Sequence, residues 1–192
     1  MKVAYIDLET TGVNPYAHGI HQIAGIIEIN GEVKEAFEFH SRPFLTDAVD
    51  AAALSVSGVN AEKLNEYPDP EFVYSEFTAL LSQYVDKYNK KDKFYFVGYN
   101  STFDYNFLRE FFKKCGDNYF GSYFWNPPID VFQLVNYRIC FVDKKREAIP
   151  HMKLKNVAEY LGIDLSNVNL HNALDDIKLT REVYYKILAG FQ

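Results

Sequence analysis

The first forty residues carry the pattern that most restricts the fold. Three runs read as β-strands from their apolar or alternating pattern: KVAYIDL (2–8), HQIAGIIEIN (21–30) and EVKEAFEFH (32–40). The dipeptide Asn30-Gly31 between the last two runs is a strong signal for a two-residue hairpin. We therefore expect the chain to begin with three antiparallel strands.

Strands and helices alternate in the rest of the chain. We expect helices over 70–88, 102–115, 154–162 and 172–190, a strand over 93–99, and a strand end leading into a helix over 129–139. Ser101 is the expected N-cap of the second of these helices, and Gly162 is expected to cap the third. The stretch 41–69 looks irregular, with one short helix near 60–67.

This order predicts an α/β protein with a mixed sheet, three antiparallel strands followed by parallel strands, and helices on both faces. A chain of 192 residues can build one domain with a substantial core, so we expect a single domain over 1–192. No apolar run approaches the roughly 20 residues that span a bilayer, so no membrane association is expected. Charged residues interrupt the start of the chain where a signal peptide needs its apolar stretch, and we expect a cytoplasmic protein.

The first strand ends in YIDLETTG (5–12), which places two carboxylates one residue apart. Alternate strand residues share a face, so Asp7 and Glu9 lie side by side. They stand at the carboxyl end of the strand, where open α/β sheets bind ligands. Like charges so close repel and raise each other's pKa, and a bound cation would make the pair favourable. Among 26 acidic residues, one such pair alone is a weak signal.

A third carboxylate falls on the apolar stripe of a predicted helix. Asp104 shares that stripe with Leu108 and Phe111. A lone carboxylate on a buried face is costly unless it is paired or binds a metal. The alternative is that Asp104 only caps the first turn and favours the helix dipole.

A fourth carboxylate lies in HNALDDIK (171–178). At about 100° per residue, Asp176 flanks the apolar face of the helix, whereas Asp175 points toward solvent. We therefore choose Asp176 as the functional residue. His171 must lie in the loop before this helix if the two are to converge, and an ordinary polar surface residue is the alternative reading of it.

The four carboxylates form an oxygen-only donor set: Asp7, Glu9, Asp104 and Asp176. Such a set suits Mg²⁺ or Mn²⁺. Two divalent ions roughly 3.5–4 Å apart are the usual arrangement for in-line phosphoryl displacement. An imidazole has an unperturbed pKa of about 6.5, so His171 could take the proton from the attacking water.

Together these motifs resemble the DEDDh (DnaQ-like) family of 3′→5′ exonucleases in the RNase H-like superfamily. The resemblance rests on DLETTG, on YNSTFDYNFL with Asn100 ahead of Asp104, and on the H-x₄-D spacing of His171 and Asp176. A sister subclass carries Tyr where this chain has Asn172. The segments HQIAGIIEI and HMKLKNVAEYLGI also resemble the family, so the likeness covers nearly the whole chain.

The resemblance implies an RNase H-like fold, two Mg²⁺ or Mn²⁺ ions, and release of nucleoside 5′-monophosphates from a 3′ end. The residues that it implies for substrate binding are Thr10, Thr11, Gly12, Val13, Asn100 and Ser57. Thr10, Thr11 and Gly12 would hold the terminal nucleotide, and Val13 would wedge against its base. Many relatives carry HGI where this chain has SVSGVN, so Ser57 replaces a His and the contact made at that position is open.

We expect a metal-dependent 3′→5′ exonuclease acting on single-stranded or frayed 3′ ends of DNA, in proofreading or end trimming. RNA 3′-end trimming is the alternative. A net charge of −6 argues against a DNA-coating protein but not against an enzyme that grips one strand end. The ending KILAGFQ favours a stand-alone nuclease or a compact subunit that docks on a DNA polymerase. An inactive nucleic-acid-binding module and a calcium-binding protein are the other classes, and the oligomeric state is open.

Several other features have two readings. The basic stretch 138–155 could steer a strand or form a solvated loop. Tyr16, Tyr99 and Tyr105 are candidates for stacking on bases or for packing in the core.

Overall fold

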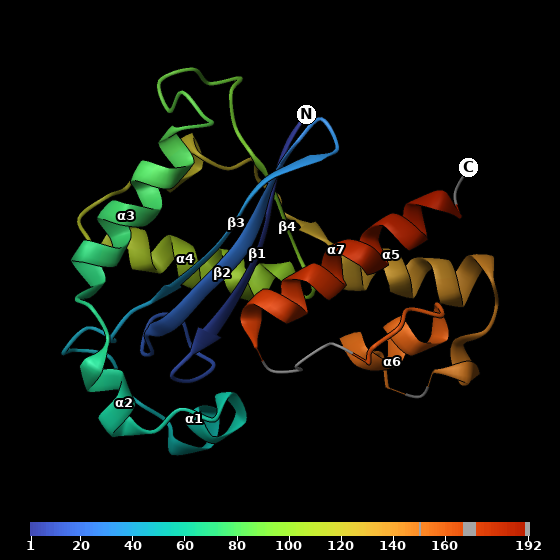
Figure 1. Ribbon diagram of the computed structural model, residues 1–192, viewed down its shortest axis with the longest axis horizontal. Helices are drawn as coiled ribbons and strands as arrows, with labels where there is room; N and C mark the ends of the chain where they lie inside the picture. Colours follow the sequence, from blue (N-terminus) through green and yellow to red (C-terminus); the bar gives the residue numbers. More distant parts are fainter. Residues whose placement is uncertain (150, 167–171, 191–192) are drawn as a thin grey trace.

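A computed structural model of the chain describes residues 1–149, 151–166 and 172–190. One mixed sheet has the strand order β3-β2-β1-β4-β5 (Figure 1). Its strands are β1 (Lys2–Thr10), β2 (Ile20–Ile29), β3 (Glu32–His40), β4 (Tyr95–Gly98) and β5 (Ile129–Asp130). β1 and β3 both pair with β2 in the antiparallel sense, whereas β1–β4 and β4–β5 are parallel. The expected fold class, with antiparallel strands first and parallel strands after, is confirmed.

The turn between β2 and β3 is the two-residue hairpin that Asn-Gly predicts. Asn30 has φ 53° and Gly31 has φ 87°, so both turn residues are in the left-handed region that this turn requires. Ile29 pairs with Glu32 directly across the turn.

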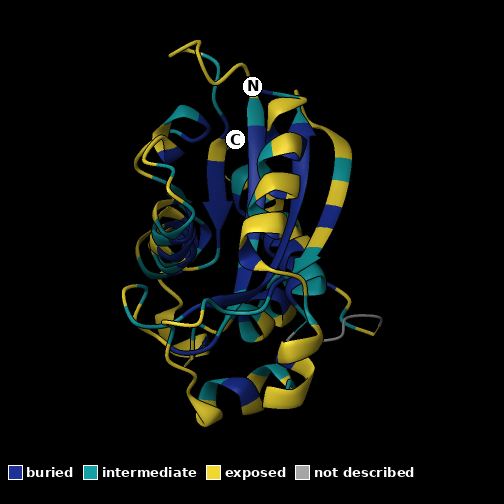
Figure 2. Cartoon of the chain, turned by 90° about the vertical axis from the view of Figure 1, so that its left-hand side faces the viewer, coloured by how far each residue is buried: buried dark blue, intermediate teal, exposed yellow. Residues whose placement is uncertain are grey.

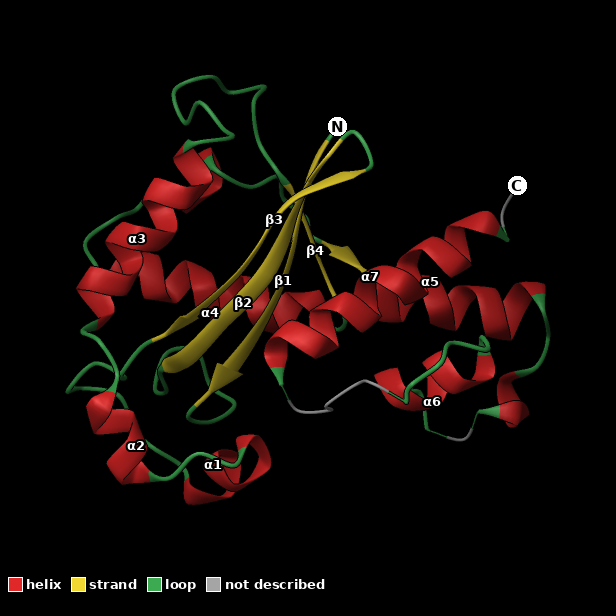
Figure 3. Cartoon of the chain, viewed as in Figure 1, coloured by secondary structure: helices red, strands yellow, loops and turns green. Residues whose placement is uncertain are grey.

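Helices cover both faces of the sheet, as Figure 3 shows. Within the described residues the α-helices are α1 (Ala51–Ser57), α2 (Ala61–Glu66), α3 (Pro70–Ser82), α4 (Ser101–Lys114), α5 (Val131–Tyr137), α6 (Leu154–Tyr160) and α7 (Ala173–Ala189). A π-helix (Arg138–Val142) continues α5 directly. None of the helices in these ranges is both long enough and apolar enough to cross a bilayer.

The sheet separates two apolar cores. On one face of β1, Ala4, Ile6 and Leu8 pack with side chains of α3 and α4. On the other face, Val3 and Tyr5 pack with side chains of α5, α6 and α7. Figure 2 shows the buried strands between helices whose outer faces are exposed. Because side chains alternate along a strand, Asp7 and Glu9 continue the face that meets α7.

Helix α1 was not predicted. Asp50 caps it by accepting a hydrogen bond from the Ala52 N–H at 2.9 Å, and Gly58 ends it at φ 70°. Leu54 is its one buried residue, so the helix has no apolar periodicity to reveal it. The two caps are the local signal from which it could have been found.

Two helix ends also differ from expectation. The N-cap of α4 is Asn100, at φ 64°, and Ser101 is the first residue of the helix and is buried. Helix α3 ends at Ser82 rather than near residue 88. The chain beyond it is held instead by tertiary contacts, because the Lys2 ammonium donates to the Tyr84 carbonyl.

Candidate active site

Asp7 and Glu9 stand near the carboxyl end of β1. The register between β1 and β2 shifts directly after Glu9, so the ladder is irregular where the site begins. Figure 1 shows this end of β1 beside the start of α7. The strand therefore presents both carboxylates to the helix that carries Asp176.

Asp104 joins the second motif to the first. Its carboxylate oxygen Oδ1 accepts a hydrogen bond from the Leu8 backbone N–H at 3.1 Å. Leu8 lies between Asp7 and Glu9 in the sequence, so this bond fixes the start of α4 against the acidic strand end. Asp104 is only 4% exposed, which confirms that it lies on the buried face of its helix.

Asp176 reaches the same place from α7. Its charge contributes to raising the pKa of both Asp7 and Glu9, so it lies on the side of α7 that faces β1. Its neighbour Asp175 forms an ion pair with the exposed Lys178, 3.0 Å away. Asp175 and Asp176 are both half-buried, so the choice of Asp176 as the functional residue stays a prediction.

Burial and mutual repulsion together shift the acidic groups. Burial raises the pKa of Asp7 well above its usual range, and the charges of Asp104, Glu9 and Asp176 raise it further. Burial and the Asp176 charge raise the pKa of Glu9 to about 7. Burial also raises the pKa of Asp104, against the opposing effect of the hydrogen bond from Leu8. A bound cation would offset the repulsion among these four carboxylates, as expected from the Asp7 and Glu9 pair.

The donor set fits a hard divalent cation, because all four groups are carboxylates. In the described ranges, however, no three His, Cys, Asp or Glu side chains are already arranged to ligate one ion. The four carboxylates are thus close enough to interact electrostatically, and they must turn toward a shared cation to bind it. His171, the expected general base, lies outside the described residues.

The loop after β1 contains most of the expected substrate-binding residues. Val13 is 81% exposed and free to meet a base. Thr11 is fully buried, and its hydroxyl donates to the Ala48 carbonyl and accepts from the Gly19 N–H. The Thr11 backbone is engaged as well, because its N–H donates to the Gly19 carbonyl and its carbonyl accepts from the Asp50 N–H. A direct contact from Thr11 to a nucleotide would therefore require these bonds to rearrange, and its expected role stays a prediction. The Thr10 hydroxyl donates to the Gly12 carbonyl at 2.7 Å and so shapes the same turn.

Gly12 has a packing reason of its own. A Cβ atom there would overlap the imidazole of His18, so any other residue would have to displace that ring whether or not a ligand approaches. The expected role of Gly12 in holding a nucleotide stays a prediction.

Ser57, at the end of α1, lies beside a buried histidine. Its hydroxyl is 3.3 Å from His21 Nε2, and burial lowers the pKa of His21 to about 4. His21 was not singled out from the sequence, because an isolated histidine in an apolar strand gives no signal of such a contact. Whether Ser57 touches substrate stays a prediction.

Asp130 is a further carboxylate next to the site that the sequence analysis missed. It accepts hydrogen bonds from the Asn100 N–H at 2.9 Å and the Phe132 N–H at 3.0 Å. Its charge also contributes to raising the pKa of Asp104. Its place at the end of a strand, like that of Asp7 and Glu9, is the signal that could have identified it. Asn100 is exposed and held by this bond at the start of α4.

The three candidate stacking tyrosines differ in exposure. Tyr16 is 76% exposed, whereas Tyr105 is 7% exposed and packs on Phe96 in the core. Tyr99 is half-buried and its hydroxyl donates to the Met152 carbonyl. In the basic stretch, Lys144 and Lys145 are exposed.

The chain is similar in sequence to known exonucleases and DNA polymerases. The family model for Exonuclease (RNase T) matches residues 4–184. A PolC-type DNA polymerase III of Thermotoga petrophila is 26% identical over 95% of this chain, which spans only 12% of that protein. Ribonuclease T of Buchnera aphidicola is 28% identical over 95% of this chain and 82% of its own length.

A solved structure shares the fold. E. coli exonuclease I in complex with a dT13 oligonucleotide superposes with a TM-score of 0.77 at 18% identity, covering 98% of this chain and 41% of exonuclease I. The match of the family model over nearly the whole chain carries the assignment. The chain belongs to the Exonuclease (RNase T) family, the DnaQ-like exonucleases of the RNase H-like superfamily.

Proposed function

We propose that this chain is a metal-dependent 3′→5′ exonuclease that removes nucleoside 5′-monophosphates from the single-stranded or frayed 3′ end of DNA. The observation that carries the proposal is the convergence of four carboxylates from β1, α4 and α7, anchored by the hydrogen bond from Leu8 to Asp104. A purely structural protein gains nothing from burying carboxylates that repel one another.

The residues divide into roles. Asp7, Glu9, Asp104 and Asp176 would hold two Mg²⁺ or Mn²⁺ ions, which supply charge neutralisation at the scissile phosphate and an activated water when bound. The Leu8 N–H keeps Asp104 oriented toward the strand end. His171 would accept the proton of the attacking water. The turn after β1 would hold the terminal nucleotide, with Val13 against its base.

The relatives support two substrate classes. One relative is named as a PolC-type DNA polymerase III. The structure of exonuclease I that shares the fold contains a DNA oligonucleotide. These favour DNA, in proofreading beside a DNA polymerase or in end trimming. The match to ribonuclease T extends over 82% of that protein's length. Its name favours RNA 3′-end trimming, which is the alternative.

A panel of 5′-labelled substrates tests this function. Single-stranded DNA, a duplex with a mismatched 3′ end, and RNA of the same sequence are each incubated with Mg²⁺ or with EDTA. We expect a ladder that shortens from the 3′ end in Mg²⁺, no cleavage in EDTA, and faster cleavage of the DNA strands than of RNA. Faster cleavage of RNA would favour RNA 3′-end trimming. If no strand is shortened, the proposed exonuclease function is wrong.

A further inference from the structure

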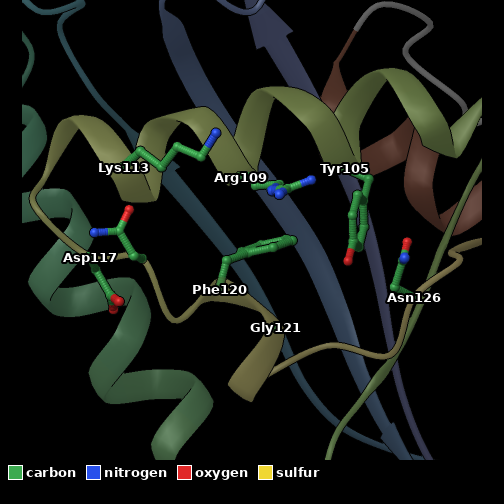
Figure 4. Close-up of a pocket in the computed structure, with 8 residues that line it drawn as sticks. Tyr105, Arg109, Lys113, Asp117, Phe120, Gly121 and Asn126 are labelled. Carbon is green, nitrogen blue, oxygen red and sulfur yellow. The ribbon is translucent and has the colours of Figure 1, made fainter.

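A second polar site lies on α4, outside the carboxylate group. It is a pocket of about 410 Å³ between α4 and the segment 117–126. Figure 4 shows Lys113, Arg109 and Tyr105 in a row along the helix, with the Phe120 ring below them and Asn126 opposite Tyr105. The row follows from the sequence, because residues four apart share one face of a helix.

The pocket contains hydrogen-bonding groups that the protein does not use. In the part of the chain that the structure describes, the side chains of Tyr105, Arg109, Asn118 and Asn126 make no hydrogen bond or ion pair. Together they offer a guanidinium, a phenol and two amides to a ligand. A folded protein that lines one pocket with four unused polar side chains leaves that capacity for water or a ligand.

The charge of the pocket favours an anion. Its one acidic side chain, Asp117, is already engaged, because it accepts hydrogen bonds from the Tyr74 hydroxyl and the Tyr119 N–H at 2.5 and 2.6 Å. The Lys113 ammonium, which also lines the pocket, is already paired with the Glu110 carboxylate 2.5 Å away. Arg109 therefore has the largest unsatisfied charge, and its planar fork of N–H donors matches the oxygens of a phosphate.

The walls of the pocket are fixed. Tyr105 is only 7% exposed and packs edge-on against Phe120, with ring centroids 4.9 Å apart. The Phe120 ring packs in turn against the rings of Phe112 and Phe124, with centroid distances of 5.1 and 4.9 Å. A phosphate at Arg109 would thus meet one donor that is already in place, the Tyr105 hydroxyl, which limits part of the ordering cost of binding.

We propose that this pocket binds a phosphate group of a nucleotide, and that in the working enzyme it is a phosphate of the substrate strand upstream of the 3′ end. This inference rests on the proposed nuclease function. Helix α4 carries both sites, since Asp104 directly precedes Tyr105 and Arg109 lies about 7.5 Å farther along the helix axis. A free 5′-mononucleotide offers the same chemistry, and the test separates the two sources.

Oligonucleotide binding is measured by fluorescence anisotropy, in EDTA, for the parent, Arg109→Gln and Lys90→Gln. Lys90 is exposed on the loop between α3 and β4, so its substitution removes the same charge elsewhere. We expect Arg109→Gln to weaken binding of a single-stranded 12-mer about tenfold and to lower the slope of log Kd against log salt by about 1. A 3-mer should bind equally to all three proteins, and Lys90→Gln should match the parent throughout.

Two results would overturn the proposal. The two substitutions could weaken binding of the 12-mer equally, or Arg109→Gln could weaken binding of the 3-mer as much as that of the 12-mer.

Titration with inorganic phosphate, followed by the amide resonances of residues 117–126, tests the pocket without any cleavage. Shifts in the parent that Arg109→Gln abolishes support it, and their absence contradicts it. Titration with dTMP separates the sources, because pocket shifts with dTMP and an unchanged 12-mer affinity in Arg109→Gln would overturn the strand assignment. Failure of the nuclease function is recognised separately, as a parent protein that cleaves neither oligonucleotide in Mg²⁺.

Discussion

The Asp104 carboxylate accepts a hydrogen bond from the Leu8 backbone N–H, and this bond ties the first turn of α4 to the strand segment between Asp7 and Glu9. Two motifs almost a hundred residues apart are thereby held in one geometry. The bond also gives Asp104 a structural role that can be separated from its charge.

Substitution of Asp104 separates the two roles. Asp104→Asn keeps an oxygen acceptor for the Leu8 N–H and removes the buried charge, whereas Asp104→Ala leaves that N–H unsatisfied. Urea unfolding in EDTA at pH 8 should therefore find the Asn variant more stable than the parent, and the Ala variant about 1–3 kcal/mol less stable than the Asn variant. Both should lose exonuclease activity. Equal stabilities of the two variants would contradict the structural role of the bond.

Glu9 makes the stability of the metal-free protein depend on pH. Its pKa is raised from 4.5 to about 7. Below pH 4.5 the carboxyl is protonated in both the folded and the unfolded protein and costs nothing, whereas above about pH 7 it is ionised in both and the full cost is present.

The free energy of unfolding without metal should therefore fall as the pH rises between these values. The difference corresponds to roughly 3 kcal/mol as an upper limit. Glu9→Gln should stabilise the metal-free protein at pH 8 and have almost no effect at about pH 3.5, where the carboxyl is protonated in both states, as measured by urea unfolding in EDTA. The exposed Glu62→Gln serves as control and should change neither value. A stabilisation by Glu9→Gln that is independent of pH would mean that its carboxyl titrates normally.

The two adjacent aspartates of α7 form a matched pair. Asp176→Asn should lower the initial rate of single-strand cleavage at least a hundredfold, because it removes a carboxylate from the metal set. Asp175→Asn loses an i,i+3 ion pair with the exposed Lys178, which is worth about 0.5 kcal/mol or less, and should cleave like the parent. If Asp175→Asn were the slower variant, the proposed orientation of α7 would be wrong.

Gly12 distinguishes packing from ligand approach. Gly12→Ala requires the His18 imidazole to move and should lower the rate of cleavage. Combining it with His18→Ala opens that space. If the glycine is needed only for packing, the double variant should recover the activity of His18→Ala alone; if a nucleotide must approach the backbone, it should stay slow. The family resemblance predicts the second outcome.

His171 is predicted to act on the proton and not on the metal. His171→Ala should keep Mn²⁺ affinity, measured by calorimetry, and should lower turnover by about 10²–10⁴, the range of general acid–base catalysis. His151→Ala, at an exposed position, is the control. Parent-like cleavage by the His171 variant would remove it from the mechanism.

The sequence predicted those parts of the fold whose signals are local and strong. Each of these elements is determined by its own local signal: β1 by alternation, the Asn30-Gly31 turn by its two residues, and α4 and α7 by their apolar faces. The apolar face of α4 also predicted correctly that Asp104 is buried. The choice of Asp176 over Asp175 stays a prediction. Helix α1 was missed because only Leu54 packs inward. Asp130 was missed although its position at a strand end is a local signal, because its hydrogen bond to Asn100, thirty residues away, is not visible in any sequence pattern.

The most direct test of the whole account is the position of manganese in a crystal soaked with Mn²⁺, located by its anomalous scattering. The account predicts two peaks bounded by Asp7, Glu9, Asp104 and Asp176, with Asp104 still bonded to the Leu8 N–H. No peak among these carboxylates, or an Asp176 side chain turned away to solvent, would contradict it.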